Sequence, residues 1–150
     1  MGQYQVYHQF TTRSPQDLRA VAETLTKLFR ERTILLLEGP VGAGKTELVK
    51  TLMQGWGIQE TASPSFAIHH HYEQGEHEID HVDLYRLQNE EDLDSTGFWD
   101  LFSARRGLVV IEWAERLNPD LLPLNWYKIK VVMQKRPAMN EREVTISLPG

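Results

Sequence analysis

Four residues in the segment EGPVGAGKTELVKTL have the types and spacing needed to bind phosphate. Gly39, Gly44, Lys45 and Thr46 match the pattern G-x-x-x-x-G-K-[ST]. Glycines let a backbone curl until successive N–H groups converge on phosphate oxygens. The lysine of such a loop reaches the β- and γ-phosphates, and the hydroxyl that follows binds Mg²⁺. The sequence therefore predicts a nucleotide-binding loop made of Gly39, Pro40, Val41, Gly42, Ala43, Gly44, Lys45 and Thr46.

Two acidic residues follow apolar segments and are candidate metal ligands. A loop of this kind needs a carboxylate at the end of a neighbouring strand to hold Mg²⁺ directly or through water. Glu112 ends the segment LVVIE, and Asp83 ends the segment EIDHVD. The sequence does not decide which of them is the direct ligand. The alternative for both is a solvated carboxylate at the end of a strand.

One serine hydroxyl is a further candidate for contact with phosphate, and several histidines are candidate metal ligands. Ser65 follows the rigid Pro64 shortly after the phosphate-binding helix, where a hydroxyl can contact the γ-phosphate and reorder on hydrolysis. The alternative is a loop stiffened by proline. His81 shares one strand face with Asp83, which suggests a zinc site, but one strand face supplies two ligands at most and no cysteine completes a tetrahedral set. The run His69, His70 and His71 is more typical of a partly exposed strand.

The segments around the loop predict an α/β fold. TILLLE and GLVVIEW are continuous apolar runs, typical of strands that helices cover on both faces. Hydrophobic spacing predicts a helix over residues 14–30 with Ser14 as its N-cap, and a second helix that starts near Thr46 and stops at Gly57.

Further strands complete the predicted sheet. Residues 65–72 and 77–85 predict a hairpin, residues 89–102 a helix interrupted at Gly97, and residues 126–133 and 143–148 an antiparallel pair at the edge of the sheet. We expect one three-layer P-loop NTPase domain over residues 1–150, with a mainly parallel central sheet and an antiparallel edge.

Composition excludes several classes of function. The chain has no cysteine, which excludes disulfides and thiolate chemistry and fits a cytoplasmic location. No segment approaches the roughly 18 apolar residues that cross a membrane, and the first residues do not resemble a secretion signal. Net charge is −5, and residues 73–100 contain ten acids against one cation, Arg86. This region would repel a nucleic-acid backbone, so we expect no direct RNA or DNA binding.

Five segments, in order, resemble one known family. EGPVGAGKT, SPSF, HVDLYRL, EEDLDSTGFWDLF and VVIEWAERL, spread over residues 35–117, are similar to motifs of the bacterial TsaE proteins, the P-loop ATPases of tRNA threonylcarbamoyladenosine biosynthesis. The resemblance implies ATP or ADP and Mg²⁺ as ligands. It implies that Thr46 and Glu112 hold the metal and that Asp83 is a second acid near it. Ser65 would be the switch hydroxyl, and Trp113 would border the nucleotide or a partner.

The same resemblance implies protein partners. TsaE acts with TsaB and TsaD, which transfer a threonylcarbamoyl group to the adenosine next to the anticodon, a transfer that TsaE itself does not make. This implies an ATPase that turns over slowly alone and is stimulated by that pair. Two residues depart from the family pattern: Ser65 replaces the usual threonine, and Glu47 stands where a second threonine or a small residue is common.

Two other classes remain open at this point. A small-molecule P-loop kinase would share the loop but would need an arginine-bearing lid, for which only Arg105 and Arg106 are candidates. A nucleotide-gated binding module with negligible turnover is the third class. A GTPase is disfavoured because no N-K-x-D motif occurs. Arg86 is the best internal candidate for an arginine finger.

Overall fold

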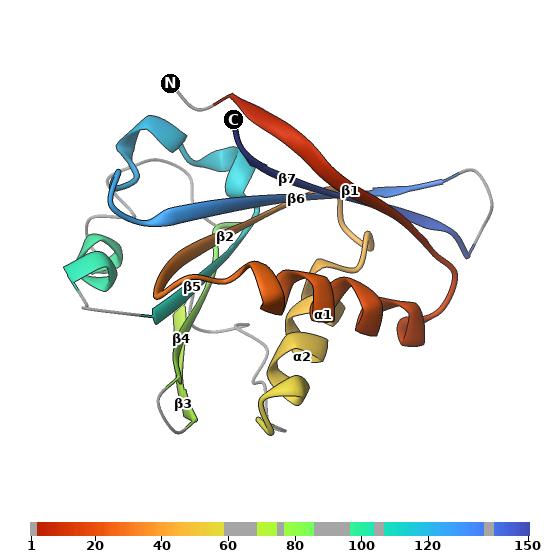
Figure 1. Cartoon of the computed structure of the whole chain (residues 1–150), viewed down its shortest axis with the longest axis horizontal. Coiled ribbons are helices and arrows are strands. Elements are labelled where there is room, and N and C mark those ends of the chain that lie inside the picture. Colours follow the sequence, from red (N-terminus) through yellow and green to blue (C-terminus); the bar gives the residue numbers. More distant parts are fainter. Residues whose placement is uncertain (1–2, 59–68, 75–76, 86–96, 104–106, 137–139) are drawn as a thin grey trace.

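A computed structural model describes residues 3–58, 69–74, 77–85, 97–103, 107–136 and 140–150. These residues form a seven-stranded sheet flanked by helices (Figure 1). The elements are β1 Tyr4–Thr12, η1 Pro15–Asp17, α1 Leu18–Leu28, β2 Arg32–Glu38, α2 Lys45–Gly55, β3 His69–Gln74, β4 His77–Asp83, η2 Phe98–Ser103, β5 Gly107–Glu112, η3 Ala114–Arg116, η4 Pro119–Leu121, β6 Tyr127–Lys135 and β7 Arg142–Pro149, where η marks a 3₁₀ helix.

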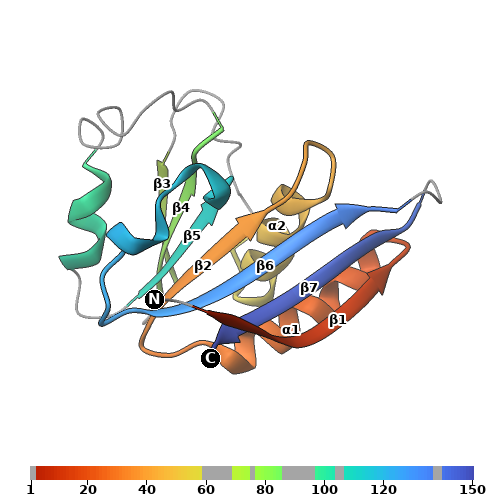
Figure 2. The same ribbon diagram turned by 90° about the horizontal axis from the view of Figure 1, so that it is seen from above.

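The centre of the sheet is parallel and both of its ends are antiparallel. Strand order is β1-β7-β6-β2-β5-β4-β3. The β2 strand pairs in parallel with β5 and β6, and β4 pairs in parallel with β5. The outer pairs β3–β4, β6–β7 and β1–β7 are antiparallel (Figure 2). The predicted α/β fold is confirmed, and the two apolar runs form adjacent central strands.

One edge of the sheet differs from the prediction. The hairpin β6–β7 was expected at the edge, but β6 pairs with β2 inside the sheet and β1 covers β7. The β1 strand was not predicted, because most of its side chains face solvent and its sequence lacks an alternating apolar pattern.

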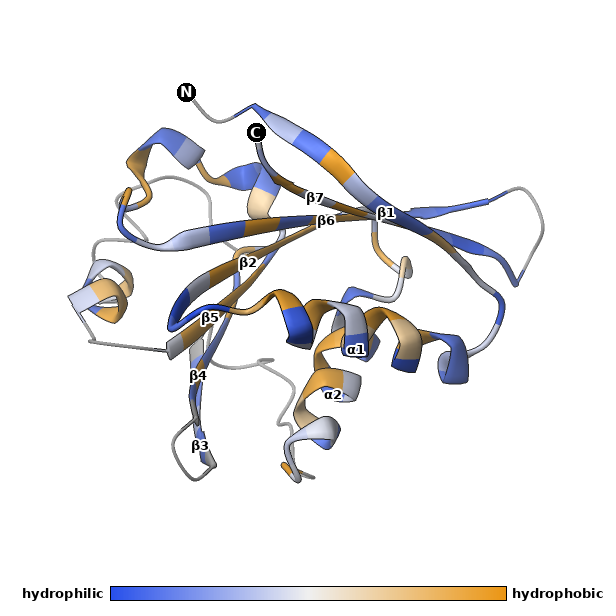
Figure 3. Cartoon of the chain, in the orientation of Figure 1, coloured by the Kyte–Doolittle hydropathy of each residue, from blue (hydrophilic) through white to orange (hydrophobic). Residues whose placement is uncertain are grey.

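Apolar side chains form a separate core on each face of the sheet. On one face α1 and α2 pack on the strands through residues such as Leu25, Leu48 and Leu52. On the other face the short η2, η3 and η4 segments pack with Phe98, Leu122 and Trp126. Figure 3 shows the apolar residues along the central strands and on one side of each helix. Two buried layers around one sheet hold the strand ends in fixed positions.

The helix ends predicted from the sequence are partly confirmed. Ser14 occupies the predicted N-cap position, at the start of η1, but its side chain makes no capping hydrogen bond. The Asp17 carboxylate accepts the Arg13 N–H at 2.7 Å. The stop at Gly57 is confirmed, since Gly57 has φ 79° and its N–H donates to Gln54 at 3.0 Å. Gly97, with φ 77°, directly precedes η2, and residues 89–96 of the predicted helix lie outside the described residues. No helix in the described part of the chain is long and apolar enough to cross a membrane.

Candidate functional site

The predicted phosphate loop connects β2 to α2 at the carboxyl ends of the parallel strands (Figure 2). Gly39 has φ 147°, and a Cβ there would lie 2.2 Å from the Met133 carbonyl oxygen. Gly44, with φ 102°, occupies the N-cap of α2 in the left-handed region. The loop therefore requires glycine at both sites, and the positive end of α2 follows it directly.

Lys45 is held at the centre of the loop. Its side chain is 5% exposed, and its ammonium donates to the Gly39 carbonyl and lies 3.4 Å from the centroid of the Trp113 ring. Burial lowers the pKa of Lys45, and the negative charges of Glu115, Glu112 and Asp83 act in the opposite direction. The three acids thus help to keep a buried cation charged where phosphate would bind.

Thr46 and Glu112 meet as the strand order requires. The Thr46 hydroxyl donates to Glu112 Oε1 at 2.9 Å, although 66 residues separate them. Glu112 is 2% exposed, and its other carboxylate oxygen lies 2.5 Å from His81 Nε2. These are hydroxyl and carboxylate oxygens beside a phosphate loop, the donor set that Mg²⁺ prefers.

Asp83 is the neighbour of Glu112 across the β4–β5 pair. It is half-buried, and its Oδ1 accepts the Tyr85 N–H at 2.9 Å. Burial raises the pKa of Asp83, the negative charge of Glu112 raises it further, and the hydrogen bond from Tyr85 opposes both. Two carboxylates at adjacent strand ends therefore repel each other when no cation lies between them.

The raised pKa of Asp83, caused first by burial and then by the charge of Glu112, gives a prediction for the protein without nucleotide or metal. The pKa of Asp83 is higher in the folded protein than in the unfolded chain. Ionisation of Asp83 therefore lowers the free energy of unfolding as the pH rises from the unfolded pKa to the folded pKa, and this loss is complete above the folded pKa. Asp83→Asn should therefore raise the melting temperature at pH 7 and should leave it unchanged below the pKa of the unfolded carboxyl. Thermal unfolding across this pH range, with EDTA present, measures the difference; a stabilisation that is equal at low and neutral pH would contradict this cause.

Sequence reasoning missed residues that hold the loop from outside. Glu115 accepts the Gly39 N–H at 3.1 Å, and Arg142 Nε donates to the Gly42 carbonyl at 3.2 Å. Neither contact has a sequence signal, because each depends on a residue brought in from a distant segment. Glu115 thus holds the start of the phosphate loop, at Gly39, and Arg142 holds its middle, at Gly42.

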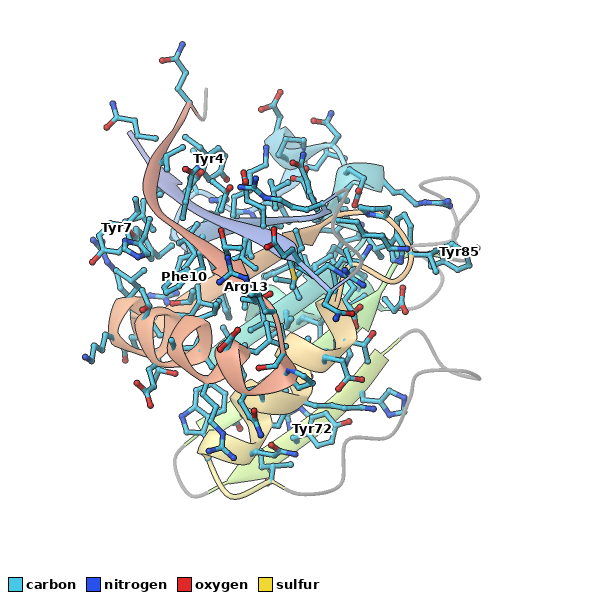
Figure 4. All side chains as sticks on the ribbon, turned by 90° about the vertical axis from the view of Figure 1, so that its right-hand side faces the viewer. Tyr4, Tyr7, Phe10, Arg13, Tyr72 and Tyr85 are labelled. Atoms are coloured by element: carbon cyan, nitrogen blue, oxygen red, sulfur yellow. The ribbon has the colours of Figure 1, made fainter. Side chains whose placement is uncertain are left out.

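Trp113 lies over the site in an unusual backbone conformation. Its φ is 62°, in the left-handed region that an aromatic residue rarely adopts. Its ring contacts the ring of Tyr85 at a centroid distance of 4.9 Å, and the Arg116 guanidinium lies 5.6 Å from it. Tyr85 is 47% exposed and projects from the surface (Figure 4). The aromatic pair forms one wall beside Lys45.

Several predicted residues cannot be placed. Ser65, Arg86, Arg105 and Arg106 lie outside the described residues. Within the described ranges no group of three or more His, Asp or Glu side chains could hold a metal ion, so the described part of the chain offers no tetrahedral zinc site. His71, from the histidine run, is 2.7 Å from Asp80 at the surface. A magnesium ion that takes phosphate and water oxygens needs no such cluster.

A mixed sheet with a parallel centre, a glycine-rich loop between β2 and α2, and an acid at the end of the neighbouring strand β5 define a P-loop NTPase fold. The fold is similar to the crystal structure of Bacillus subtilis YdiB, with a TM-score of 0.72 and 29% sequence identity, covering 100% of this chain and 90% of that one.

Sequence comparison identifies the family. The family model described as "Threonylcarbamoyl adenosine biosynthesis protein TsaE" matches residues 12–144. The chain is 33% identical to the tRNA threonylcarbamoyladenosine biosynthesis protein TsaE of Bacillus subtilis over 144 residues, which cover 95% of this chain and 86% of that protein. It is 34% identical to the TsaE of Treponema pallidum, with 91% and 97% covered. The chain belongs to the TsaE family.

Proposed function

We propose that this chain is a Mg²⁺-dependent ATPase that works with TsaB and TsaD in the threonylcarbamoyl modification of tRNA. One observation carries the proposal: the Thr46 hydroxyl and the Glu112 carboxylate are hydrogen-bonded at 2.9 Å directly beside a phosphate loop that contains Lys45. Membership of the TsaE family supports the tRNA-modification role.

A cavity beside the loop suits the remainder of the nucleotide. It has a volume of about 260 Å³ and lies between the start of η1, the phosphate loop and the C-terminal hairpin. Its lining includes Thr12, Arg13, Gly42, Met133 and Arg142. A larger hollow of about 990 Å³ is lined by Arg30, Trp126 and Tyr127, but it includes none of the loop residues. We therefore assign the nucleoside to the smaller cavity.

The chain's own residues would divide the work as follows. The loop N–H groups and the N-terminus of α2 bind the phosphates, and Lys45 exchanges its contact with the Gly39 carbonyl for a phosphate oxygen. Thr46 and Glu112 would hold Mg²⁺, which neutralises charge on the phosphate oxygens when it is bound. Asp83, which pairs with Glu112 across β4 and β5, would orient water near the metal. Ser65 is proposed as the hydroxyl that contacts the γ-phosphate.

Partners are proposed for two reasons. Three arginines near the loop in the described part of the chain make other contacts, so none is assigned as an arginine finger: Arg142 donates to a loop carbonyl, Arg13 pairs with Glu141, and Arg116 lies over the aromatic pair. The acidic balance of the chain also disfavours direct contact with tRNA. A TsaB–TsaD pair would then supply both the missing charge and the tRNA contact. The cytoplasmic location expected from the sequence belongs to the same proposal.

The test is ATP turnover by the purified chain with Mg²⁺, alone and with a TsaB–TsaD pair from the same organism, with modified tRNA measured in parallel. We expect slow turnover alone, a clear rise with the pair, and repeated rounds of modification only when all three proteins are present. Fast ATP turnover that does not change when the pair is added would contradict the proposal. It would favour a kinase that transfers phosphate to a small-molecule acceptor. Binding without turnover in any combination would favour a nucleotide-gated binding module.

A further inference from the structure

A buried histidine contacts the proposed metal ligand but has no role in the mechanism above. His81, in β4, is 2% exposed, and its Nε2 lies 2.5 Å from Glu112 Oε2. Glu112 is buried to the same extent. The pair therefore lies inside the protein, beneath the site, where it has little contact with solvent.

The hydrogen bonding of this ring is one-sided. His81 Nδ1 is buried and has no hydrogen-bond partner in the described structure. An ionised carboxylate only accepts, so Nε2 must carry the proton that joins His81 to Glu112. A buried polar atom left unpaired is unfavourable, and such atoms in a native protein call for an explanation. A role for the Nε2 contact would account for keeping a histidine here despite the unpaired Nδ1.

The two oxygens of Glu112 are each held by one contact. Oε1 accepts from Thr46, and Oε2 is engaged by His81. The terminal torsion of a glutamate is broad, so a carboxylate held at a single oxygen can rotate. With both contacts present, the plane of the carboxylate is fixed. Outer partners of this kind orient metal ligands in many proteins, and their loss typically weakens metal binding.

We propose that His81 is a positioning residue that fixes the Glu112 carboxylate, so that Oε1 faces Thr46 and the metal they share. This role rests on the proposed Mg²⁺-ATPase function. It depends on the hydrogen bond from Nε2 and needs no change of protonation during the cycle. This role differs from packing, because an apolar or shorter side chain that is equally buried could not donate a hydrogen bond to Glu112.

Two substitutions separate positioning from packing. In His81→Gln the side-chain amide nitrogen comes close to the place of Nε2, so the donor to Glu112 is kept. In His81→Asn the amide ends near the place of Nδ1 and cannot reach Glu112. The control is His71→Asn, the same substitution at an exposed histidine of the neighbouring strand, whose Nδ1 lies 2.7 Å from Asp80.

The main readout is the affinity of the protein–ADP complex for Mn²⁺, a paramagnetic probe for the magnesium site, measured by the EPR signal of free Mn²⁺. ADP affinity in EDTA is measured beside it. We expect His81→Asn to weaken Mn²⁺ binding about 10–100-fold while ADP affinity without metal is unchanged. His81→Gln should stay close to the wild type, and His71→Asn should match it.

The outcomes distinguish the two proposals. If the wild-type complex with ADP binds no Mn²⁺, the proposed ATPase function fails and the role of His81 fails with it. If the wild type binds Mn²⁺ and the two His81 variants bind it equally well, or equally poorly, only the positioning role is overturned. The wild type offers an independent check by ¹⁵N NMR of the His81 ring. We expect the proton on Nε2 and a bare Nδ1; a neutral ring with its proton on Nδ1 could not donate to Glu112 and would refute the proposal.

Discussion

Glu112→Gln is expected to lower Mg²⁺-dependent ATP turnover about 10²–10³-fold, the loss typical when a preorganised electrostatic group is removed from an active site. The substitution keeps the size of the side chain and leaves an oxygen that can accept the Thr46 hydroxyl. It removes the negative charge facing the metal and, at Oε2, the acceptor of the His81 contact. Nucleotide affinity in EDTA should change little, because the loop N–H groups and Lys45 supply that binding.

The matched control is Glu38→Gln. Glu38 also ends a central strand, but its carboxylate lies 3.4 Å from the Lys130 ammonium, and it is partly exposed. Steady-state turnover and ADP binding are measured for both variants against a Mg²⁺ titration. Glu38→Gln should behave like the wild type. Normal turnover in Glu112→Gln would move the role of metal ligand to Asp83, and loss of ADP binding in EDTA would point to a folding defect instead.

Gly39→Ala is expected to reduce the free energy of unfolding by about 3 kcal/mol, which combines the strain of its φ with overpacking. The added Cβ would lie 2.2 Å from the Met133 carbonyl oxygen, and the backbone there is restrained, because Met133 pairs with Val144 of β7 and the preceding Val132 pairs with Glu38 of β2. For a chain of this size the melting temperature should fall by about 10 °C. Nucleotide affinity should fall as well, since the loop starts at this residue.

Gly55→Ala provides the opposite expectation in the same protein. Gly55 lies in the last turn of α2, and a Cβ there would meet nothing within 4 Å. Alanine is favoured over glycine inside a helix by about 1 kcal/mol, so this variant should be neutral or more stable. Urea denaturation of both variants gives the comparison. Equal destabilisation by the two substitutions would show that the close approach of β6 is not the cause.

The central strands were predictable because their sequence reflects burial on both sides. TILLLE and GLVVIEW lie in β2 and β5, which pair in parallel. Helices or 3₁₀ segments cover both faces of these strands. The β1 strand lacked any such signal. It lies at the edge, and its Val6 and Tyr7 are exposed, so its place follows from pairing with β7 and not from its own pattern.

The site was predictable where a general rule of topology applies. Parallel strands carry their carboxyl ends to one edge, which brings Glu112 and Asp83 to the loop that follows β2. The contacts of Glu115, Arg142 and His81 Nε2 could not be inferred in this way, because they depend on side-chain directions that only the packed structure fixes. The functions of all these residues are still predictions.

The order of the strands also determines when the site can form during synthesis. The β2 strand that carries the phosphate loop is flanked by β5 and β6, which the ribosome makes much later, and Tyr4 of β1 waits for Pro149 of β7. Pairings between such distant segments form slowly. The nascent chain must therefore hold its apolar β2 segment without a strand partner until β5, Gly107–Glu112, has been made, a period when chaperone protection would matter most.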